Sequence, residues 1–221
     1  MVVVKFSLMH RRNKRAIVRL LVILALPFTF LESVLAVPPL EEKLSGLASI
    51  TTQFRQQTSR DREVHHGRLW VKKPNKFRYE TTSPWQQSLV SNGQIFWNYD
   101  TDLEQLTIDN LAHDPAKFPI LLLSGQSDQI AELYEVEAYA DEKYHVYHLS
   151  PKTENHYFAS VSLVFLEDKP SSIVIRDAMG RFTEITFTET EVNTGLSDEV
   201  FEFSAPDGVD IVDQRTIAGD S

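Results

Sequence analysis

The spacing of apolar residues along the chain changes once, near residue 57. Before that point they recur every three or four residues, at Leu40, Leu44, Leu47, Ile50 and Phe54. On an α-helix these intervals place the five side chains on one face, and the proline pair that precedes them suits the first turn of a helix. The pattern therefore predicts one amphipathic helix over residues 40–54, whose apolar face covers another part of the protein.

Beyond residue 57 apolar and polar residues alternate, which is typical of antiparallel strands with one buried and one wet face. Ile185 and Phe187 point to the same side, and Trp97 shares a face with Ile95 and Tyr99. The predicted strands are 65–72, 76–81, 86–91, 94–99, 103–108, 134–139, 143–149, 159–166, 171–177, 182–189 and 200–204.

Turn signals separate these strands. Asn92-Gly93 between two alternating runs is a strong hairpin signal, and residues 177–180 indicate a second hairpin. Only residues 110–133 interrupt the alternation, and there we expect one or two short helices. About eleven strands joined by short turns predict a mainly β fold, in which antiparallel strands form a curled sheet or barrel. Because the chain has no internal repeat and no linker, we expect a single domain.

The first 36 residues have a different character. They hold six Lys or Arg and one Glu, a net charge of +5, followed by an apolar run over residues 20–30. That run is about half of the ~20 residues needed to span a bilayer, and small residues lead up to Ala36. This order indicates a secretory signal peptide cleaved between Ala36 and Val37, with a transmembrane anchor as the alternative and Met1 or Met9 as the start.

Charge and cysteine content narrow the function. The 221 residues carry a formal net charge of −9, so residues 37–221 carry −14. This acidity disfavours a nucleic-acid partner and predicts basic patches on protein partners. The absence of cysteine excludes disulfides, cysteine-ligated zinc, thiol catalysis and a lipid-modified N-terminal cysteine. We expect residues 37–221 to form an exported, soluble, monomeric domain.

Catalytic motifs are absent from the sequence: it has no nucleophile elbow, phosphate-binding loop or zinc-protease pattern. His65 and His66 are adjacent and face opposite ways on a strand, so they do not easily share a metal. We therefore expect no enzyme activity and no metal site. What remains is an apolar surface, which is either plain core or the wall of a ligand cavity; the pattern alone leaves both open.

Five segments carry a more specific signal. They are Gly67-Arg-Leu-Trp-Val-Lys-Lys-Pro-Asn-Lys-Phe-Arg-Tyr79, Val90-Ser-Asn-Gly93, Trp97-Asn-Tyr-Asp100 with Leu103-Glu-Gln105, Leu149-Ser-Pro-Lys152, and 201–214. Each is weak alone, but in this order and spacing they cover nearly all of the chain after residue 36. The set resembles the signature of the LolA-type outer-membrane lipoprotein carriers.

The resemblance implies an unclosed antiparallel β-barrel with short helices forming a lid over an apolar cavity. It also implies a periplasmic shuttle that takes acylated lipoproteins from an ATP-driven inner-membrane ABC transporter and delivers them to an outer-membrane receptor. Burying an acyl chain is worth about 0.8 kcal/mol per CH₂, so such chains need cover to cross water. The transporter's ATP supplies the energy, so no cofactor is expected.

The resemblance also points to site residues. Lys73 stands where the family usually has an arginine that hydrogen-bonds the lid of the empty cavity; lysine keeps the charge but lacks the planar fork of donors. Phe77 is expected to line the cavity. The acyl-chain cavity and lid are thus predicted to involve Lys73, Phe77, Leu40, Leu44, Leu47, Ile50, Phe54 and Trp97.

Other functions fit the same fold. The anchored receptor of the pathway needs a lipid-modified cysteine, which this chain lacks. A periplasmic stress sensor of related fold carries a second domain, for which residues 37–221 leave no room. A carrier of other lipids or glycolipids is the main alternative. A periplasmic hydrolase and an adaptor with a filled barrel are the others.

Overall fold

The computed structural model describes residues 37–60, 63–112, 118–124, 130–153 and 158–215. The predicted signal peptide lies outside these residues, so its cleavage between Ala36 and Val37 stays a prediction. None of the helices in these ranges has the length and apolar character needed to cross a bilayer.

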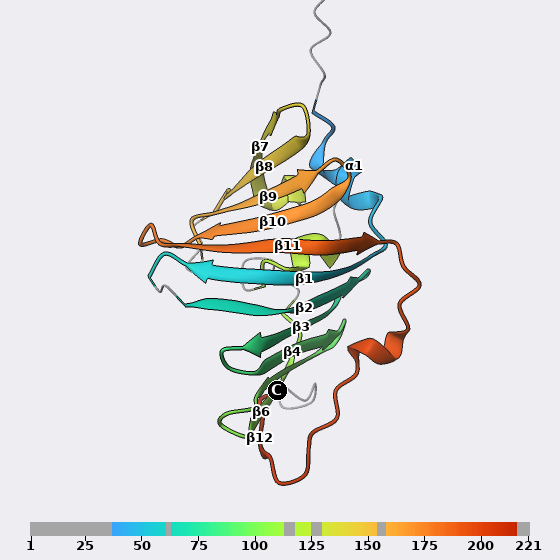
Figure 1. Cartoon of the computed structure of the whole chain (residues 1–221), viewed down its shortest axis with the longest axis vertical. Coiled ribbons are helices and arrows are strands. Elements are labelled where there is room, and N and C mark those ends of the chain that lie inside the picture. The colour runs from blue at the N-terminus through green and yellow to red at the C-terminus, as the bar shows by residue number, and fades with distance from the viewer. Residues whose placement is uncertain (1–36, 61–62, 113–117, 125–129, 154–157, 216–221) are drawn as a thin grey trace, which may run out of the picture. The chain divides into compact units, whose positions relative to one another are not determined.

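Twelve strands form one sheet in the order β12-β6-β5-β4-β3-β2-β1-β11-β10-β9-β8-β7 (Figure 1). The strands are β1 (Ser49–Thr58), β2 (Val64–Lys72), β3 (Lys76–Ser83), β4 (Gln87–Asn92), β5 (Ile95–Asp100), β6 (Gln105–Asn110), β7 (Tyr134–Ala140), β8 (Tyr144–Pro151), β9 (Ser160–Leu166), β10 (Lys169–Arg176), β11 (Phe182–Val192) and β12 (Asp210–Asp213). Neighbours are antiparallel except β12 and β6, which are parallel. In the described residues β12 and β7 end the sheet without pairing, so the predicted unclosed antiparallel architecture is confirmed.

Ten of the eleven predicted strands are present, within a few residues of their expected ends. The Asn92-Gly93 turn joins β4 to β5 with Gly93 at φ +97°, and the turn after Asp177 joins β10 to β11 with Gly180 at φ +79°. Glycine adopts these left-handed angles without the strain that a Cβ would cause. The two short helices expected between β6 and β7 are α2 (Leu121–Ser124) and α3 (Ile130–Leu133).

The helix predicted over residues 40–54 is wrong beyond its first turns. Helix α1 spans Leu40–Ser45, and β1 begins at Ser49. Ile50 and Phe54 are therefore strand residues, buried on one side of β1 while Gln53 and Arg55 are exposed. A spacing of four residues fits a helix face and a strand face equally, and the β-branched run Ile50-Thr-Thr52 favours the strand.

The strand predicted over residues 200–204 is also wrong. Residues Asp198–Phe201 form the 3₁₀ helix η2, with Ser197 capping its start through a hydrogen bond from the Glu199 amide. The strand of this region comes later, at β12, where it pairs with β6. In Figure 1 the red segment after β11 passes through η2 and reaches β12 at the other end of the sheet.

The two faces of the sheet carry separate apolar clusters. We call the inner face the side that bears Phe54, Leu69 and Phe77, because α1, α2 and α3 contribute buried residues to the same cluster. The outer face carries a smaller cluster of Val90, Trp97 and Leu106. Alternation along β4 and β5 produces this division, since successive side chains point to opposite sides.

Candidate functional site

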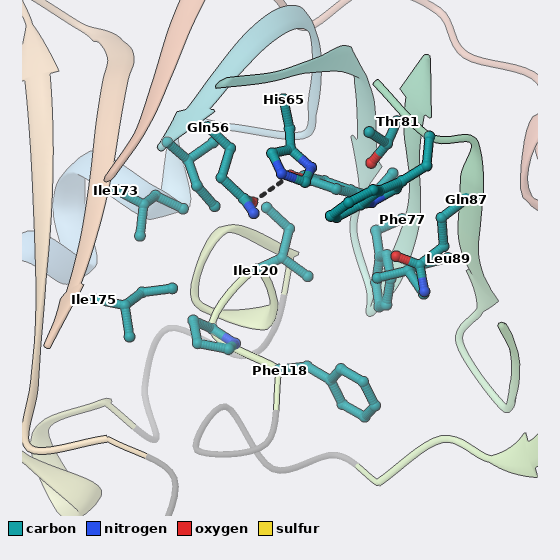
Figure 2. A pocket seen from close by; sticks show the side chains of 14 residues that line it. Gln56, His65, Phe77, Thr81, Gln87, Leu89, Phe118, Ile120, Ile173 and Ile175 are labelled. Carbon is teal, nitrogen blue, oxygen red and sulfur yellow. Dashed lines mark hydrogen bonds between the residues drawn. The ribbon is translucent and has the colours of Figure 1, made fainter. Parts of the chain in front are cut away.

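A pocket of about 470 Å³ opens on the inner face. Its walls come from β1 to β4, from β10 and β11, and from the segment before α2 (Figure 2). In a flat sheet β4 and β10 would lie about 24 Å apart, five strand spacings, so the sheet must curl around this space. The lining residues are Gln56, His65, Phe77, Tyr79, Thr81, Trp85, Gln87, Leu89, Phe118, Pro119, Ile120, Ile173, Ile175 and Ile185.

The apolar part of the wall has two sources. Ile173 and Ile175 of β10 face the pocket from one side in Figure 2, and Phe118 and Ile120 close it from another. Phe118 lies 4.6 Å from Phe96, centroid to centroid, and so anchors the covering segment on the sheet. Because these apolar side chains are more favourably covered by hydrocarbon than by water, this part of the pocket suits a hydrocarbon ligand.

An aromatic stack supports the floor of the pocket. The ring of Phe54 stacks on Tyr79 at 4.1 Å, and the Tyr79 hydroxyl donates a hydrogen bond of 2.6 Å to Gln56 Oε1. Burial raises the pKa of Tyr79 well above its ordinary value, so the phenol stays neutral. Gly67 lies opposite Phe54 on β2, where a Cβ would come within 2.4 Å of the Phe54 ring. Glycine at this position makes room for the stack.

The turn between β2 and β3 holds the covering helices. Lys73 Nζ donates a hydrogen bond of 2.6 Å to the Leu44 carbonyl in the last turn of α1, where a cation is favoured by the helix dipole. The Asn75 amide donates to the Ser124 carbonyl at the end of α2, at 2.8 Å. Burial lowers the pKa of Lys73. One turn therefore contacts both helices.

Other polar contacts tie α1 to the far half of the sheet. Lys43 Nζ pairs with Asp168 at 2.5 Å, and the Tyr147 hydroxyl donates to the Pro38 carbonyl at 2.8 Å. Asn193 accepts from the Ala48 amide at 2.7 Å. These contacts are two hydrogen bonds and an ion pair, and they fix α1 and the residues on either side of it to the sheet.

Trp85 stands at the pocket mouth. Its ring lies edge-on to His65, with centroids 4.6 Å apart, and 45% of the residue is exposed. A large aromatic side chain half in water suits a boundary between an apolar interior and solvent.

Of the predicted site residues, Phe77 lines the pocket. Lys73 contacts α1 as described above. The remaining inner-face residues pack in the main cluster beside the pocket without lining it: Leu40, Leu44, Leu47, Ile50 and Phe54.

The expectation for Trp97 needs correction. Its side chain belongs to the outer cluster with Val90 and Leu106 and does not line the pocket. The alternation of β5 correctly placed Trp97 beside Ile95 and Tyr99, but it could not say which face of the sheet they share. Phe96, the next residue along, is the one that contacts the inner cluster.

Sequence reasoning missed the isoleucines of β10 and β11 and the segment 118–120. The alternation of Ile173, Ile175 and Ile185 was a usable signal, because it marks an apolar face on strands distant in sequence from Phe77. Among the described residues, no group of three or more His, Asp or Glu side chains is arranged to hold a metal ion.

The fold is thus a curled antiparallel sheet with a largely apolar pocket that the segment before α2 closes on one side. The family model described as outer membrane lipoprotein carrier protein LolA matches residues 45–204. The chain therefore belongs to the LolA family.

Individual relatives agree with this assignment. The chain is 35% identical over 181 residues to an outer-membrane lipoprotein carrier protein of Hahella chejuensis, covering 77% of this chain and 87% of the relative. It is 31% identical over 193 residues to the protein of the same description in Chromohalobacter salexigens, covering 86% and 92%. An uncharacterized conserved protein of Thermus thermophilus shares the fold, with a TM-score of 0.52, 16% identity, and coverage of 79% of this chain and 97% of that one.

Proposed function

We propose that residues 37–221, freed of the signal peptide, act in the periplasm as a non-enzymatic carrier that covers the acyl chains of lipoproteins. The observation that carries this proposal is the apolar pocket between β3, β4, β10 and β11. Two relatives described as outer-membrane lipoprotein carriers support the cargo. In this proposal an ATP-driven inner-membrane transporter loads the carrier and an outer-membrane receptor unloads it, so the carrier itself needs no cofactor.

The pocket volume sets what loading demands. A methylene group occupies about 30 Å³, roughly the volume of one water molecule in the liquid. The pocket of about 470 Å³ therefore holds roughly 16 carbons, which is one long acyl chain. Burying that many methylenes is worth about 13 kcal/mol at 0.8 kcal/mol each. A cargo with three chains needs more room, and the segment 118–120 and α1 are the elements whose displacement would provide it. Lys73, bonded to α1, is the proposed latch.

A release assay tests the proposal. Inner-membrane vesicles that hold the transporter and an acylated lipoprotein are mixed with residues 37–221 and ATP, and the lipoprotein in the supernatant is measured. Release that requires both ATP and the carrier is expected. Phe77→Glu, which puts a charge into the pocket wall, should abolish release, whereas Trp85→Phe, at the mouth, should retain most of it. If the lipoprotein stays on the vesicles while a known carrier releases it, the proposal fails.

A further inference from the structure

The pocket wall is not uniformly apolar, and its polar groups are gathered on one side. Gln56, His65, Thr81 and Gln87 all line the pocket. In Figure 2 Gln56, His65 and Thr81 lie on the side opposite the segment with Phe118 and Ile120. A pocket for hydrocarbon alone has no use for four hydrogen-bonding side chains, because each must be desolvated when the pocket fills.

Strand pairing brings these residues together. Gln56 is directly opposite His65 across β1 and β2, and Thr81 is directly opposite Gln87 across β3 and β4. Directly opposed side chains have Cβ atoms about 5 Å apart. On the other side Gln56 faces Ile185, which faces Ile173. In this row of the wall, the β10 and β11 positions are therefore apolar and the β1 and β2 positions are polar.

Part of the hydrogen-bonding capacity of these side chains is left open toward the pocket. Gln56 uses Oε1 to accept from Tyr79, which leaves its Nε2 donors. Gln87 uses Nε2 to donate to Asn98 Oδ1 at 2.9 Å, which leaves its Oε1 acceptor. Thr81 adds a hydroxyl and His65 an imidazole, each able to donate or accept. Donors and acceptors are thus both available.

Formal charge is missing from the same wall. No Asp, Glu, Lys or Arg stands among the described residues that line the pocket. An anionic group buried there would lack a fixed counter-charge, and burying an unpaired ion is strongly unfavourable. An uncharged group with both donors and acceptors, such as a glycerol ester or an amide, matches the wall instead.

We propose that Gln56, His65, Thr81 and Gln87 form a head-group subsite that binds the uncharged glyceryl ester of an acylated ligand and discriminates against anionic lipids. This inference rests on the proposed function, since it assumes that an acyl chain enters the apolar part of the pocket. The chain would lie against Ile173, Ile175 and Ile185, and the ester would lie against the four polar side chains.

Three probes with the same hydrocarbon length test it on residues 37–221: 1-monolauroylglycerol, 1-lauroyl-lysophosphatidate and dodecane. Their dissociation constants are measured by displacement of a neutral apolar fluorophore at pH 8.5. The glycerol and phosphate probes differ only in the phosphate group. We expect monolauroylglycerol to bind at least tenfold more tightly than the phosphate probe. Equal affinities would overturn the proposal without requiring any variant.

The double variant Thr81→Val/Gln87→Met removes two hydrogen-bonding groups and keeps the side-chain size. Since one neutral hydrogen bond is worth about fivefold in affinity, monolauroylglycerol should bind at least tenfold more weakly while dodecane changes less than twofold. Thr188→Val, on the exposed side of β11, is the matched control and should change neither. Thermal unfolding of each variant verifies that it folds.

The outcomes separate the two proposals. If the double variant binds monolauroylglycerol as tightly as the original chain, or loses dodecane to the same extent, the head-group subsite is refuted and the carrier proposal stands. If neither monolauroylglycerol nor dodecane binds the original chain, the pocket takes no acyl chain and the proposed function itself fails.

Discussion

The two faces of the sheet bury apolar residues in different ways. On the outer face Val90, Trp97 and Leu106 are covered by the chain itself, since Phe203 and Val209 of the C-terminal segment pack on them. On the inner face Phe77 borders a pocket of about 470 Å³. The outer cluster is covered by the protein's own side chains, whereas the inner face borders an open pocket.

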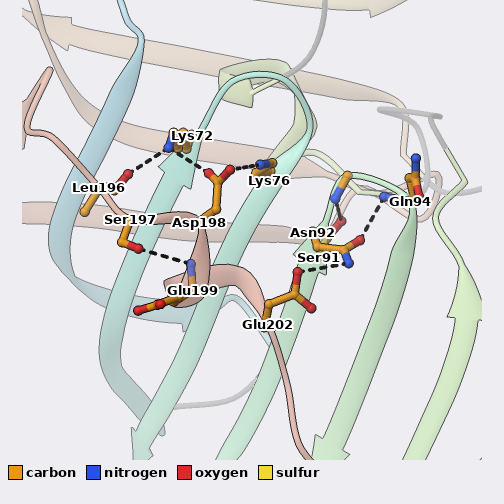
Figure 3. A network of polar contacts seen from close by, with 11 residues as sticks. Lys72, Lys76, Ser91, Asn92, Gln94, Leu196, Ser197, Asp198, Glu199 and Glu202 are labelled. Atoms are coloured by element: carbon orange, nitrogen blue, oxygen red, sulfur yellow. Dashed lines mark hydrogen bonds and ion pairs between the residues drawn. The ribbon is translucent and has the colours of Figure 1, made fainter.

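Polar contacts fasten the outer segment. Lys72 and Lys76 both pair with Asp198 of η2, at 2.7 and 2.9 Å, and Lys72 also donates to the Leu196 carbonyl at 2.7 Å (Figure 3). Asn92 reaches Glu202 just beyond η2. The segment from 196 to 202 thus follows the outer face of β2 to β4. The inner cover consists of short helices and the segment 118–120; the turn that contains Lys73 contacts α1, and Lys43 pairs α1 with Asp168.

The largest expected effect is on the inner face, at Gly67→Ala. The new Cβ would stand 2.0 Å from the Glu80 carbonyl oxygen and 2.4 Å from the Phe54 ring, so strand β3 or the stack must move. We expect the free energy of unfolding to fall by at least about 3 kcal/mol, measured by urea denaturation. Gly195→Ala, where a Cβ meets nothing within 4 Å, is the matched control and should change little. Equal stability of the two variants would contradict the packing described here.

Trp97→Leu tests whether the outer cluster is a structural core alone. Because Trp97 is 8% exposed, we expect a loss of about 2 kcal/mol in stability with no change in the affinity for an acyl probe. Denaturation and fluorophore displacement measure the two quantities. A weakened probe affinity in a folded variant would make Trp97 part of the binding site after all and would remove the contrast between the faces.

Lys73→Met tests the hold on the inner cover. Losing a charged donor to the Leu44 carbonyl should cost about 1 kcal/mol for a partly buried group. If α1 acts as a lid, the association rate of the acyl probe in stopped-flow mixing should rise. Lys73→Arg keeps the donor and should restore the original rate. An unchanged rate in the methionine variant would argue that α1 is a fixed part of the core.

The smallest effect is expected for Asp198→Asn on the outer face. Hydrogen bonds from Lys72 and then Lys76 hold the pKa of Asp198 below its usual value of 3.8. A depressed carboxyl pKa contributes stability above pH 3.8, and that contribution is lost as the pH falls through the lower folded value. The melting temperature of Asp198→Asn should therefore lie slightly below that of the original chain at pH 7, and the gap should close as the pH falls below 3.8. A gap that persists at low pH would point to a cause other than the ion pairs.

Local pattern was sufficient for most of the sheet. Ten predicted strands and both glycine turns are present because alternation and turn chemistry are properties of neighbouring residues. The errors have the same origin. Ile50 and Phe54 satisfy both the helical and the strand spacing, and β12 is four residues long with two aspartates, so it has almost no hydrophobic pattern. Its pairing with β6 depends on residues about a hundred positions away.

The site was predicted less completely than the fold. Phe77 and Lys73 came from the resemblance to the family; Phe77 lines the pocket, whereas Lys73 contacts α1 and its role as a latch stays a prediction. Ile173 and Ile185 were visible only as members of an apolar face, because nothing in their sequence neighbourhood says that β10 curls toward β3. The polar side chains Gln56 and Gln87 carried no signal at all, since an isolated glutamine on a strand is ordinarily solvated.

The sequence by itself determined which residues share a face of each strand, as with Trp97, Ile95 and Tyr99, because the two-residue period is local. Only the tertiary structure decided which face of the sheet is covered by the C-terminal segment and which face borders the open pocket. That choice depends on where the segment after β11 runs and where residues 118–120 settle. Both are long-range contacts, whose formation depends on the whole sheet and leaves no trace in the local pattern.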